Sequence, residues 1–563
     1  MTGILCVFIL AQVYSALEIP YYMGAIVYRY NTTADVWGNA GWMLLFSSVS
    51  IICLIAMTYL ASRIGANVAR SLRTQIFNKI QDFAPQELGE FSTPSLITRT
   101  TNDVVQVSMA VQMSLRFLIQ MPIMMMLATY RILTSNLQLS IVVAIAIAVL
   151  VALVGAMVAV IIPKFSLLQK ITDKVNAAAR ENLTGLRVVR AYNAQKHQQD
   201  KFEIENKKLT RIALFVDRIN ALADPIINLV MHGATVGIFW FGAYLINREI
   251  IISSDLVHFM GLAAQMITAF LLMIMALIFV PRGMVSAKRI YQVLDKPLKM
   301  QEGQGANQNE AKGEVEFKNV FFKYPDAEEN VLADISFKIE KGQTVGFIGS
   351  TGSGKSTLIK LVPRFYDVTE GEVLIDGVDV RQYKKSELYK KLGYVPQRGV
   401  LFSGTIKSNI AFGEFETEPT LQEIEKAAEV ACALEFIEKR ENQYESEISQ
   451  GGKNVSGGQK QRLSIARAIA KNPAIYIFDD SFSALDNKTD KELRQKLKSH
   501  TINATCLIVA SRIGTIINAD KIIVLDKGKI VGQGTHDELL KSCDVYKQIA
   551  HSQLDKGGDD FVS

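Results

Sequence analysis

The sequence predicts a multi-pass α-helical membrane domain followed by a soluble α/β domain. Of the 563 residues, 49% are hydrophobic and 21% are charged, and the long charged stretches gather in the second half of the chain. The first half instead contains apolar windows of about 20 residues, the length that a helix needs to cross the hydrocarbon of a bilayer. The chain is also too long for one compact domain, because a domain usually holds roughly 100 to 200 residues.

Six windows poor in charged residues are predicted to span the membrane. Five are long enough by themselves, although Glu18 interrupts the first. The third is short, and its flanking Arg116 and Arg131 would have to extend toward the two interfaces. The windows cover residues 3–28, 36–62, 117–130, 141–162, 225–247 and 256–280.

The connecting segments predict the orientation of these spans. Lys and Arg concentrate in the segments 62–116 and 163–224, whereas the links around Asn31, Ser135 and Ser253 are short and carry little charge. Because basic loops stay on the cytoplasmic side, both long segments and both termini are predicted to be cytoplasmic. The long segments keep the apolar spacing of helices, so we expect the spanning helices to continue into the cytosol.

A polar stretch at 296–312 contains Gly303 and Gly305 and predicts a linker between a membrane domain at 1–295 and a second domain at 313–563. Strands and helices alternate beyond it. The pair Asp376-Gly377 predicts a hairpin turn, and the runs TVGFI, AIYIF and CLIVA are typical of buried parallel strands. This order predicts an α/β fold.

The segment GSTGSGKST matches the pattern G-x-x-x-x-G-K-[ST] between an apolar strand and a helix. Its glycines let backbone N–H groups close around phosphate oxygens, and the helix presents its positive N-terminal end to them. Lys355 would neutralise the β- and γ-phosphates, and Ser356 would ligate Mg²⁺. The predicted phosphate loop comprises Gly349, Ser350, Thr351, Gly352, Ser353, Gly354, Lys355, Ser356 and Thr357.

Ser456 and Gln459 form a capping box at the start of a predicted helix that stops at Asn472-Pro473. A capping box alone indicates only a well-capped helix. Here Gly457 and Gly458 remove side chains from the helix N-terminus, so its N–H groups could meet a second phosphate group.

The third motif is the apolar strand 475–478, which ends in Asp479 and Asp480. A carboxylate at the end of a strand can hold Mg²⁺ opposite a phosphate loop. An apolar run followed by aspartate is weak evidence by itself. The three motifs in this order within one domain predict a nucleotide-binding site.

The order GSTGSGKST, VSGGQ, IYIFDD and SALD resembles the nucleotide-binding domain of ABC proteins, and six spans before such a domain are similar to the half-transporters of ABC exporters. The segments FSTPSLITRTTNDV and ENLTGLRVVRAYNAQ resemble bacterial multidrug exporters built from two unlike halves. The resemblance covers the whole chain. It implies a multi-pass protein of the bacterial plasma membrane with a cytoplasmic nucleotide-binding domain that uses ATP and Mg²⁺.

The resemblance also implies roles for individual residues. Tyr324 would stack on adenine, Asp479 would hold Mg²⁺ together with Ser356, and Gln397 would sense this ion and link the site to the membrane helices. The segment from Ser456 to Gln459 would close over the ATP of a partner chain, and Asp486 would cross the dimer interface. Two chains would thus enclose two ATP molecules.

Two residues depart from the pattern of this family. Asp480 stands where the family has a glutamate that acts as general base, and Ser511 replaces the switch histidine. The shorter carboxylate is withdrawn by roughly 1 Å, and a misplacement of this size can cost about a hundredfold in rate. We therefore expect a site that retains ATP but hydrolyses it slowly, beside a non-identical partner with intact Glu and His. Both residues could instead be tolerated variants of a working site.

Other function classes fit less well. The net charge of +6 comes without a basic block interleaved with aromatics, which argues against nucleic-acid binding. The cysteines lack the paired spacing of a zinc site or a disulfide framework. An ATP-gated regulatory protein and a homodimeric lipid or peptide exporter remain alternatives. The expected partners are the lipid bilayer, a second half-transporter and an amphipathic drug or lipid.

The membrane domain contains few candidates for substrate contact. Glu18 is the first, because a carboxylate within a span is costly and often marks a translocation path, although a buried partner or an interfacial position explains it equally well. Gln120, His232 and Gln265 are weaker candidates. The chain begins almost inside the first span, where exporters of this kind have a basic amphipathic segment, so its start is open to reassignment.

Overall fold

The computed structural model describes residues 2–27, 32–305, 312–325, 327–415 and 417–554. It divides into a helical unit, formed by Met1–Ile80 and Pro94–Lys296, and an α/β unit, formed by Gln81–Thr93 and Pro297–Ser563. Within the predicted linker at 296–312, residues 306–311 lie outside the described part, as do Tyr28 and Asn31. The sequence analysis placed residues 81–93 in the first domain, whereas the structure groups them with the second unit.

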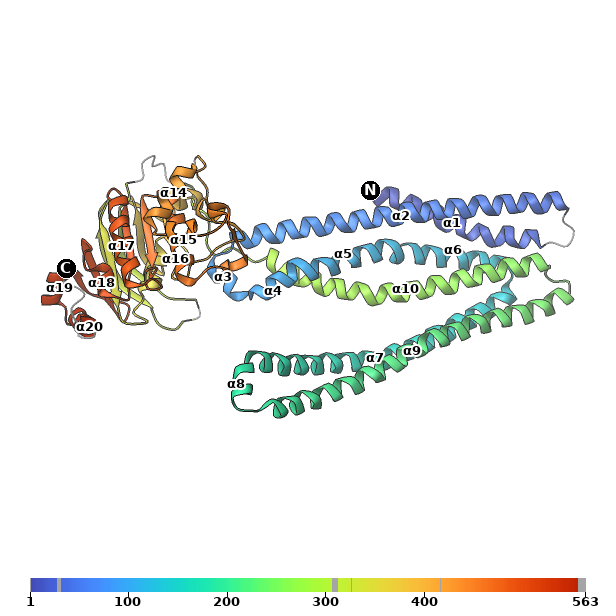
Figure 1. Ribbon diagram of the computed structural model, residues 1–563. Coiled ribbons are helices and arrows are strands. Elements are labelled where there is room, and N and C mark those ends of the chain that lie inside the picture. Colours follow the sequence, from blue (N-terminus) through green and yellow to red (C-terminus); the bar gives the residue numbers. More distant parts are fainter. Residues whose placement is uncertain (1, 28–31, 306–311, 326, 416, 555–563) are drawn as a thin grey trace. The chain divides into compact units, whose positions relative to one another are not determined.

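Among its described residues, the helical unit contains 6 helical segments that are long and apolar enough to cross a membrane, which confirms the predicted number of spans. The third predicted span, at 117–130, is part of a much longer segment, Thr93–Ser135. The other five are α1 (Thr2–Ile26), α2 (Thr33–Asp82), α7 (Leu137–Thr184), α9 (Gln195–Asn247) and α10 (Ser253–Leu294) (Figure 1).

The third segment is an irregular helix. It consists of α4 (Thr93–Thr98), the π-helical turn η1 (Arg99–Asp103), α5 (Val104–Met113), the π-helical turn η2 (Ser114–Leu118) and α6 (Gln120–Ser135). The carboxylate of Asp103 is 3% exposed and accepts a hydrogen bond from Ser286 Oγ of α10 at 2.8 Å. The irregular stretch is thereby fastened to α10.

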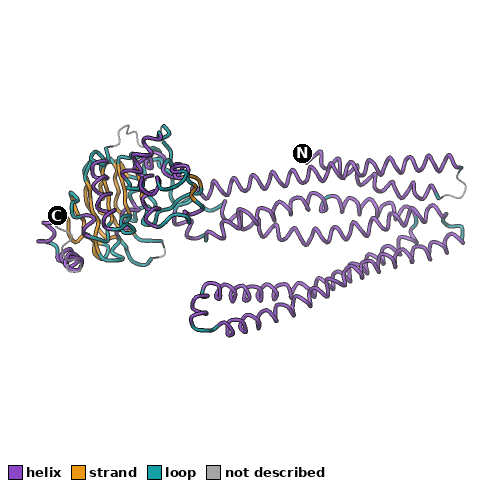
Figure 2. The backbone as a smooth tube through the Cα atoms, viewed as in Figure 1, coloured by secondary structure: helices purple, strands orange, loops and turns teal. Residues whose placement is uncertain are grey.

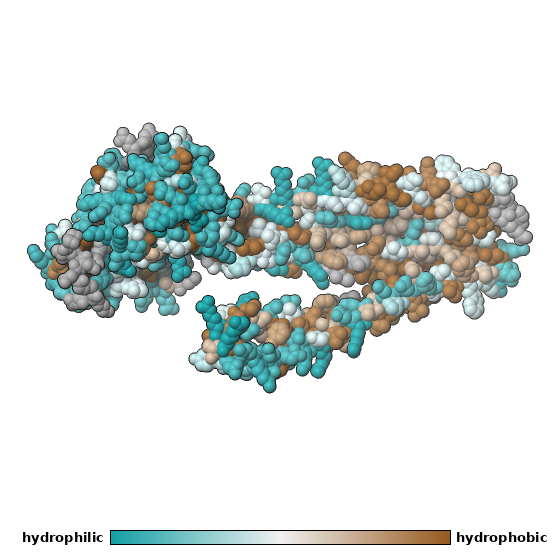
Figure 3. All heavy atoms as spheres, in the orientation of Figure 1, coloured by the Kyte–Doolittle hydropathy of each residue, from teal (hydrophilic) through white to brown (hydrophobic). Residues whose placement is uncertain are grey.

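Helix α2 packs through a narrow stripe of small residues. Ala61, Gly65 and Ala69 recur every four positions and are buried, which allows close approach of a neighbouring helix. Ser108 Oγ of α5 donates to the carbonyl oxygen of Gly65 at 2.9 Å across this contact. Many apolar side chains are exposed on the helical unit, and on the face seen in Figure 3 they gather away from its hydrophilic arms, as a lipid-facing surface requires.

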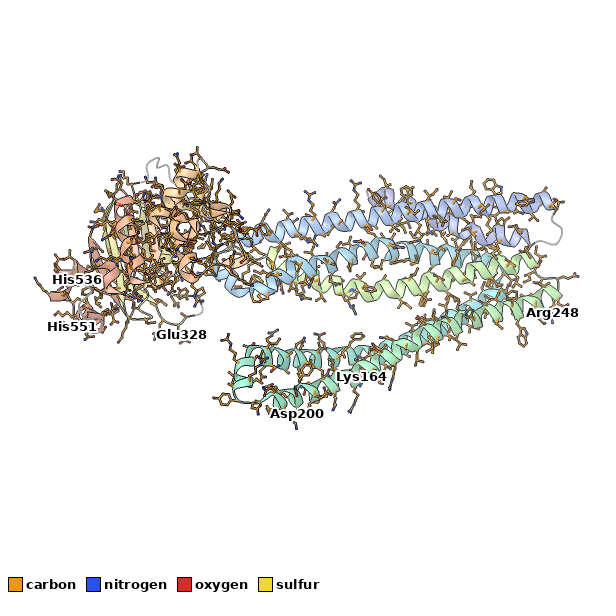
Figure 4. All side chains as sticks on the ribbon, in the orientation of Figure 1. Lys164, Asp200, Arg248, Glu328, His536 and His551 are labelled. Carbon is orange, nitrogen blue, oxygen red and sulfur yellow. The ribbon has the colours of Figure 1, made fainter. Side chains whose placement is uncertain are left out.

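Helices α7 and α9 pack along each other and are joined by the short α8 (Leu186–Ala191) (Figures 1 and 4). Both helices extend well beyond their apolar windows into the basic segment at 163–224, as predicted for helices with long inner arms. On these arms Lys164 Nζ lies 5.7 Å from the centre of the Phe215 ring. Figure 4 labels Lys164 on α7 and Asp200 on α9.

The strands belong to the α/β unit (Figure 2). A four-stranded antiparallel sheet has the order β2-β1-β4-β5, and a six-stranded sheet has the order β12-β11-β3-β10-β9-β6. In the latter, β11, β3, β10, β9 and β6 are parallel, which confirms the predicted buried parallel strands. The strands are β1 (Val315–Phe322), β2 (Leu332–Ile339), β3 (Thr344–Gly349), β4 (Glu370–Ile375), β5 (Val378–Asp379), β6 (Leu392–Val395), β7 (Gly404–Thr405), β8 (Glu447–Ile448), β9 (Ile475–Asp479), β10 (Thr505–Val509), β11 (Lys521–Asp526) and β12 (Lys529–Gly534).

Helices surround these sheets. Asp376 and Gly377 form the predicted hairpin turn between β4 and β5, with φ of 53° and 80°. The helices are α3 (Pro85–Glu90), α11 (Lys355–Leu361), α12 (Lys385–Lys390), α13 (Ile406–Ile410), α14 (Leu421–Val430), α15 (Leu434–Glu438), η3 (Gln443–Glu445), η4 (Gln450–Gly452), α16 (Gly457–Lys471), α17 (Asn487–His500), α18 (Ile513–Ile516), α19 (His536–Ser542) and α20 (Asp544–Leu554).

Candidate nucleotide-binding site

The predicted phosphate loop connects the carboxyl end of β3 to the N-terminus of α11. Gly354 immediately precedes the helix with φ of +97°, and a Cβ atom there would lie 2.7 Å from Cδ2 of Leu332. Both the backbone conformation and the close packing therefore require glycine. The loop is placed at the end of a parallel strand, where ligands of open α/β sheets bind.

The ammonium group of Lys355 folds back over this loop. Its Nζ donates to the carbonyl oxygens of Gly349 at 2.9 Å and Ser350 at 2.8 Å. Partial burial lowers the pKa of Lys355, and the nearby negative charge of Asp480 opposes that shift. The lysine thus holds a positive charge inside the loop, where phosphate oxygens could replace the carbonyl oxygens as its partners.

Ser356 and Asp479, the two residues that the sequence analysis assigned to Mg²⁺, contact each other. Ser356 Oγ at the start of α11 donates to Asp479 Oδ1 at the end of β9 over 2.6 Å. Asp479 is buried, and its second oxygen accepts from the hydroxyl of Tyr394 on β6 at 3.4 Å. A hydroxyl and a carboxylate are the hard oxygen donors that Mg²⁺ prefers, so these side chains fit the ion.

Two other predicted residues, Ser511 and Gln397, meet at Asp480. Its Oδ1 accepts from Ser511 Oγ at 3.0 Å, and its Oδ2 accepts from Gln397 Nε2 at 3.3 Å. The backbone of Asp480 is left-handed, with φ of 49°, a conformation that aspartate tolerates better than most residues. Two neutral donors therefore hold the carboxylate in place beside Asp479.

Tyr324 contacts the C-terminal end of the phosphate loop. Its hydroxyl is 3.1 Å from Oγ1 of Thr357, the last residue of the predicted loop. The ring packs edge to face with those of Phe322 and Tyr366, with centroids 4.9 and 5.3 Å apart. This packing fixes an aromatic side chain next to the loop, where it could adjoin a nucleotide base.

The segment from Ser456 to Gln459 has the predicted capping box. Ser456 Oγ accepts from the backbone N–H of Gln459, and Gln459 Oε1 accepts from the backbone N–H of Ser456. A Cβ atom at Gly458 would lie 3.5 Å from the carbonyl oxygen of Ala484, and nothing lies within 4 Å of one at Gly457. The N-terminus of α16 is therefore bare, as predicted.

Asp486 is the N-cap residue of α17, and its side chain accepts from the backbone N–H of Thr489 at 3.0 Å. This hydrogen bond lowers the pKa of the Asp486 carboxyl group. Among the described residues, no hydrogen bond joins Asp486 or the segment from Ser456 to Gln459 to the phosphate loop. The two groups of predicted site residues are thus separate within the chain.

Two residues of the site were missed by the sequence analysis. Tyr394 contacts Asp479, and its pKa is raised by burial and by that carboxylate. Gln461 of α16 is 1% exposed, donates to the carbonyl oxygen of Pro396 at 3.0 Å and accepts from the N–H of Gly399 at 2.9 Å. It therefore holds the loop that carries Gln397. The pairing of strands β6 and β9 would have indicated Tyr394, whereas no local pattern indicates Gln461.

The candidates in the helical unit have partners within the bundle. Glu18 of α1 forms an ion pair with Arg131 of α6, and their side chains are 13% and 25% exposed. Gln120 donates to Gln12 Oε1 at 2.6 Å. Gln265 Nε2 donates to a backbone carbonyl oxygen of α1 at 2.7 Å, whereas His232 is exposed. Glu18 thus has an ion-pair partner that is partly buried.

Two family profiles match the chain. The profile described as ABC transporter matches residues 332–483, and the profile described as ABC transporter transmembrane region matches residues 2–270. The fold is similar to that of a bacterial Atm1-family ABC exporter solved with ATP bound. The TM-score is 0.81 at 22% sequence identity, and the match covers 99% of this chain and 98% of that one.

Curated relatives match along most of their length. An uncharacterized ABC transporter ATP-binding protein of Mycobacterium tuberculosis is 38% identical over 92% of this chain and 90% of that protein. YfiB of Bacillus subtilis, also described as an uncharacterized ABC transporter ATP-binding protein, is 33% identical over 93% and 90%. The ATP-dependent lipid A-core flippase of Pseudomonas fluorescens is 31% identical over 90% and 83%. On these matches, and with a phosphate loop that follows six apolar helical segments, the chain belongs to the ABC transporter family.

Proposed function

We propose that this subunit of an ATP-driven ABC exporter, a multi-pass protein of the plasma membrane, binds ATP at a slow site of its own and completes a fast site on a different partner half. The observation that carries this proposal is the environment of Asp480. Its carboxylate is held by Ser511 and Gln397, which are both neutral donors. Serine cannot take up a proton and carry positive charge as a histidine can.

ATP binding does not need the missing groups. Lys355 would contact the β- and γ-phosphates, the backbone of the phosphate loop would surround them, and Tyr324 would adjoin the adenine. Ser356, Asp479 and Gln397 would hold Mg²⁺, which supplies positive charge to the phosphate oxygens when bound. Tyr324 contacts Thr357 of the loop, and the other side chains lie around the carboxyl ends of β3, β6 and β9, so little rearrangement is required for the nucleotide to be retained.

Hydrolysis at this site is expected to be slow for a geometric reason. A general base must reach the attacking water within hydrogen-bond distance, roughly 2.6 to 3.2 Å. Asp480 is one methylene shorter than glutamate, and its two oxygens are occupied by Ser511 and Gln397. The family glutamate and histidine are therefore assigned to the partner, whose ATP would be covered by Ser456 to Gln459 of this chain.

The substrate is proposed to be an amphipathic molecule, either a drug or a lipid. The relative from Pseudomonas fluorescens is described as an ATP-dependent lipid A-core flippase, which favours a lipid over a peptide. The exposed apolar surface of the helical unit is compatible with access from the bilayer. The second candidate is a homodimeric lipid exporter with two copies of the Asp480 site, which the similarity to the lipid A-core flippase also favours.

Co-purification separates the two candidates. The tagged chain is extracted from its native membranes, its companion is identified by mass spectrometry, and ATPase activity is measured for the companion complex and for the tagged chain alone. We expect a second ABC half that carries Glu and His at the positions equivalent to Asp480 and Ser511, and a much higher turnover in the complex. A complex that contains this chain alone and hydrolyses ATP at full rate would contradict the proposal and favour the homodimer.

A further inference from the structure

The segment Gln81–Thr93 belongs to the α/β unit, although the residues before and after it belong to the helical unit. The chain therefore crosses between the units after Ile80, after Thr93 and after Lys296. Helix α3 lies inside the inserted segment and begins with Pro85, a residue favoured at the first helical position. These three crossings are the covalent routes by which a change in one unit reaches the other.

Glu87 of α3 connects the inserted segment to the residues that follow the third crossing. Its side chain is 0% exposed, its Oε2 accepts from the N–H of Ala84 at 2.8 Å, and its Oε1 accepts from the N–H of Lys299 at 2.9 Å. The first bond is local, since glutamate at the third helical position commonly reaches back to the residue before the helix. The second spans 212 positions of sequence and fastens α3 to the residues that follow α10.

Burial of the Glu87 carboxylate is costly unless hydrogen bonds compensate it. Hydrogen bonds from backbone N–H groups to a carboxylate are among the stronger ones. A capping role alone would be met equally well by an exposed glutamate. Lys299 also forms an ion pair with Glu90 of the same helix at 3.6 Å, but both side chains are nearly half exposed. Glu87 is therefore the buried member of this connection and Glu90 its solvated neighbour.

The inserted segment is also held as one body within the α/β unit. The rings of Phe83 and Phe91 stack with centroids 6.0 Å apart and planes at 6°, which brings its two ends together. Lys385 Nζ of α12 donates to the carbonyl oxygen of Asp82 at 3.3 Å. A displacement of the α/β unit therefore moves the whole segment.

We infer that Glu87 is a positioning residue that clamps the inserted segment to residues 297–300, so that movement of the α/β unit on ATP binding reaches α2, α4 and α10 together. This inference rests on the proposed function only in naming ATP as the cause of that movement. The clamp acts through two backbone contacts and takes no part in the chemistry at the nucleotide. Its loss would separate the nucleotide response of the α/β unit from that of the helices.

Hydrogen–deuterium exchange of the full chain in lipid nanodiscs, with and without Mg-ATP, tests the clamp. In Glu87→Ala we expect the amide of Lys299 to exchange at least about tenfold faster, because its charged acceptor is lost. The matched control Glu90→Ala removes the half-exposed ion pair with Lys299 and should leave that amide protected. Glu87→Leu keeps much of the volume but supplies no acceptor, and replaces the alanine variant if the latter does not fold.

The second readout is the response to nucleotide. In wild type and Glu90→Ala, Mg-ATP should slow exchange both in the phosphate loop at 349–357 and in residues 94–103. In Glu87→Ala the loop should still respond, whereas the response at 94–103 should be largely lost. An unchanged response at 94–103, or an unchanged Lys299 amide, would overturn the clamp. A phosphate loop that does not respond in wild type would refute ATP binding, while the Lys299 amide would still test the Glu87 contact.

Discussion

Ser511 Oγ donates a hydrogen bond to Asp480 Oδ1 over 3.0 Å, so the two residues that depart from the family pattern contact each other directly. They come from the ends of neighbouring parallel strands, β10 and β9. A histidine at position 511 could exchange a proton with its neighbour near neutral pH, whereas a serine hydroxyl cannot. The pair is therefore compatible with retention of a nucleotide and poorly suited to its hydrolysis.

ATP should bind to this chain despite the slow site. We expect Lys355→Ala to weaken binding by about tenfold or more, because a hydrogen-bonded charge opposite the phosphates is lost. Asp480→Asn should bind nearly as wild type, since binding needs no general base. Fluorescence titration with a labelled ATP analogue measures both variants. Absence of saturable binding to the wild-type chain would refute the role of the phosphate loop.

The two groups of site residues should have unequal effects in the complex with the partner half. Gly458→Asp would put a carboxylate against the γ-phosphate of the partner's ATP, and repulsion should abolish ATPase activity and transport. Asp480→Asn should reduce activity much less, because it changes a site that contributes little turnover. Steady-state ATPase at saturating ATP compares the two variants.

Gly458→Ala is the control for damage to the fold. A Cβ atom there makes only ordinary contacts, at 3.5 and 3.8 Å, with Ala484 and Leu485. This variant should therefore purify and melt as wild type. If Asp480→Asn proved as inactive as Gly458→Asp, the assignment of the fast site to the partner would be wrong.

Asp376 should be critical for the stability of the α/β unit. Its side chain is fully buried, accepts from the N–H groups of Gly313 and Glu314, and pairs with Lys391 at 2.6 Å. Asp376→Ala leaves a buried ammonium group without its partner, which costs about 3–5 kcal/mol. Thermal unfolding of the purified chain should show a marked loss of stability.

A second variant separates charge from packing at this position. Adding Lys391→Met to Asp376→Ala removes the unpaired charge and should recover part of the loss, while the two backbone donors remain unsatisfied. Glu435→Ala breaks an exposed pair with Lys439 and should leave the unfolding temperature unchanged. Equal stability of Asp376→Ala and Glu435→Ala would show that the buried pair is dispensable.

The pair of Glu18 and Arg131 should act in assembly of the bundle. Arg131→Ala leaves a largely buried carboxylate between α1 and α6, so we expect a lower yield of monodisperse protein in detergent. The exchange of charges, Glu18→Arg with Arg131→Glu, should restore that yield and transport together. Restored yield without transport would instead favour direct contact of Glu18 with the substrate.

The motifs were predictable because their signals are local. About ten neighbouring residues are enough to predict the conformation of each motif, namely the phosphate loop, the capping box at Ser456 and the strand before Asp479. The meeting of Gln397, Asp480 and Ser511 followed only from the family resemblance, and the parallel order of β10, β9 and β6 explains it.

Other features depend on tertiary contacts that no local pattern indicates. Glu87 lies in a polar stretch typical of a solvated surface, yet its bond to Lys299 crosses 212 positions. In the sequence, Gln461 resembles any other polar residue of the helix that follows the capping box. In the structure it is buried against the loop that carries Gln397. The helix that carries the third predicted span, at 117–130, extends from Thr93 to Ser135, because a helix longer than the bilayer continues through residues that an apolar window does not include.

The central claim is that Asp480 and Ser511 make this chain's own site slow, and back-substitution tests it most directly. Steady-state phosphate release is measured for the purified chain alone and for Asp480→Glu with Ser511→His, with Ser511→Ala as a control that removes the hydrogen bond without supplying a histidine. The account predicts slow turnover in the wild type and the control, and an increase of about a hundredfold in the double variant, because a base of full length and its switch are restored. Rapid turnover by the wild-type chain alone, unchanged in the double variant, would contradict it.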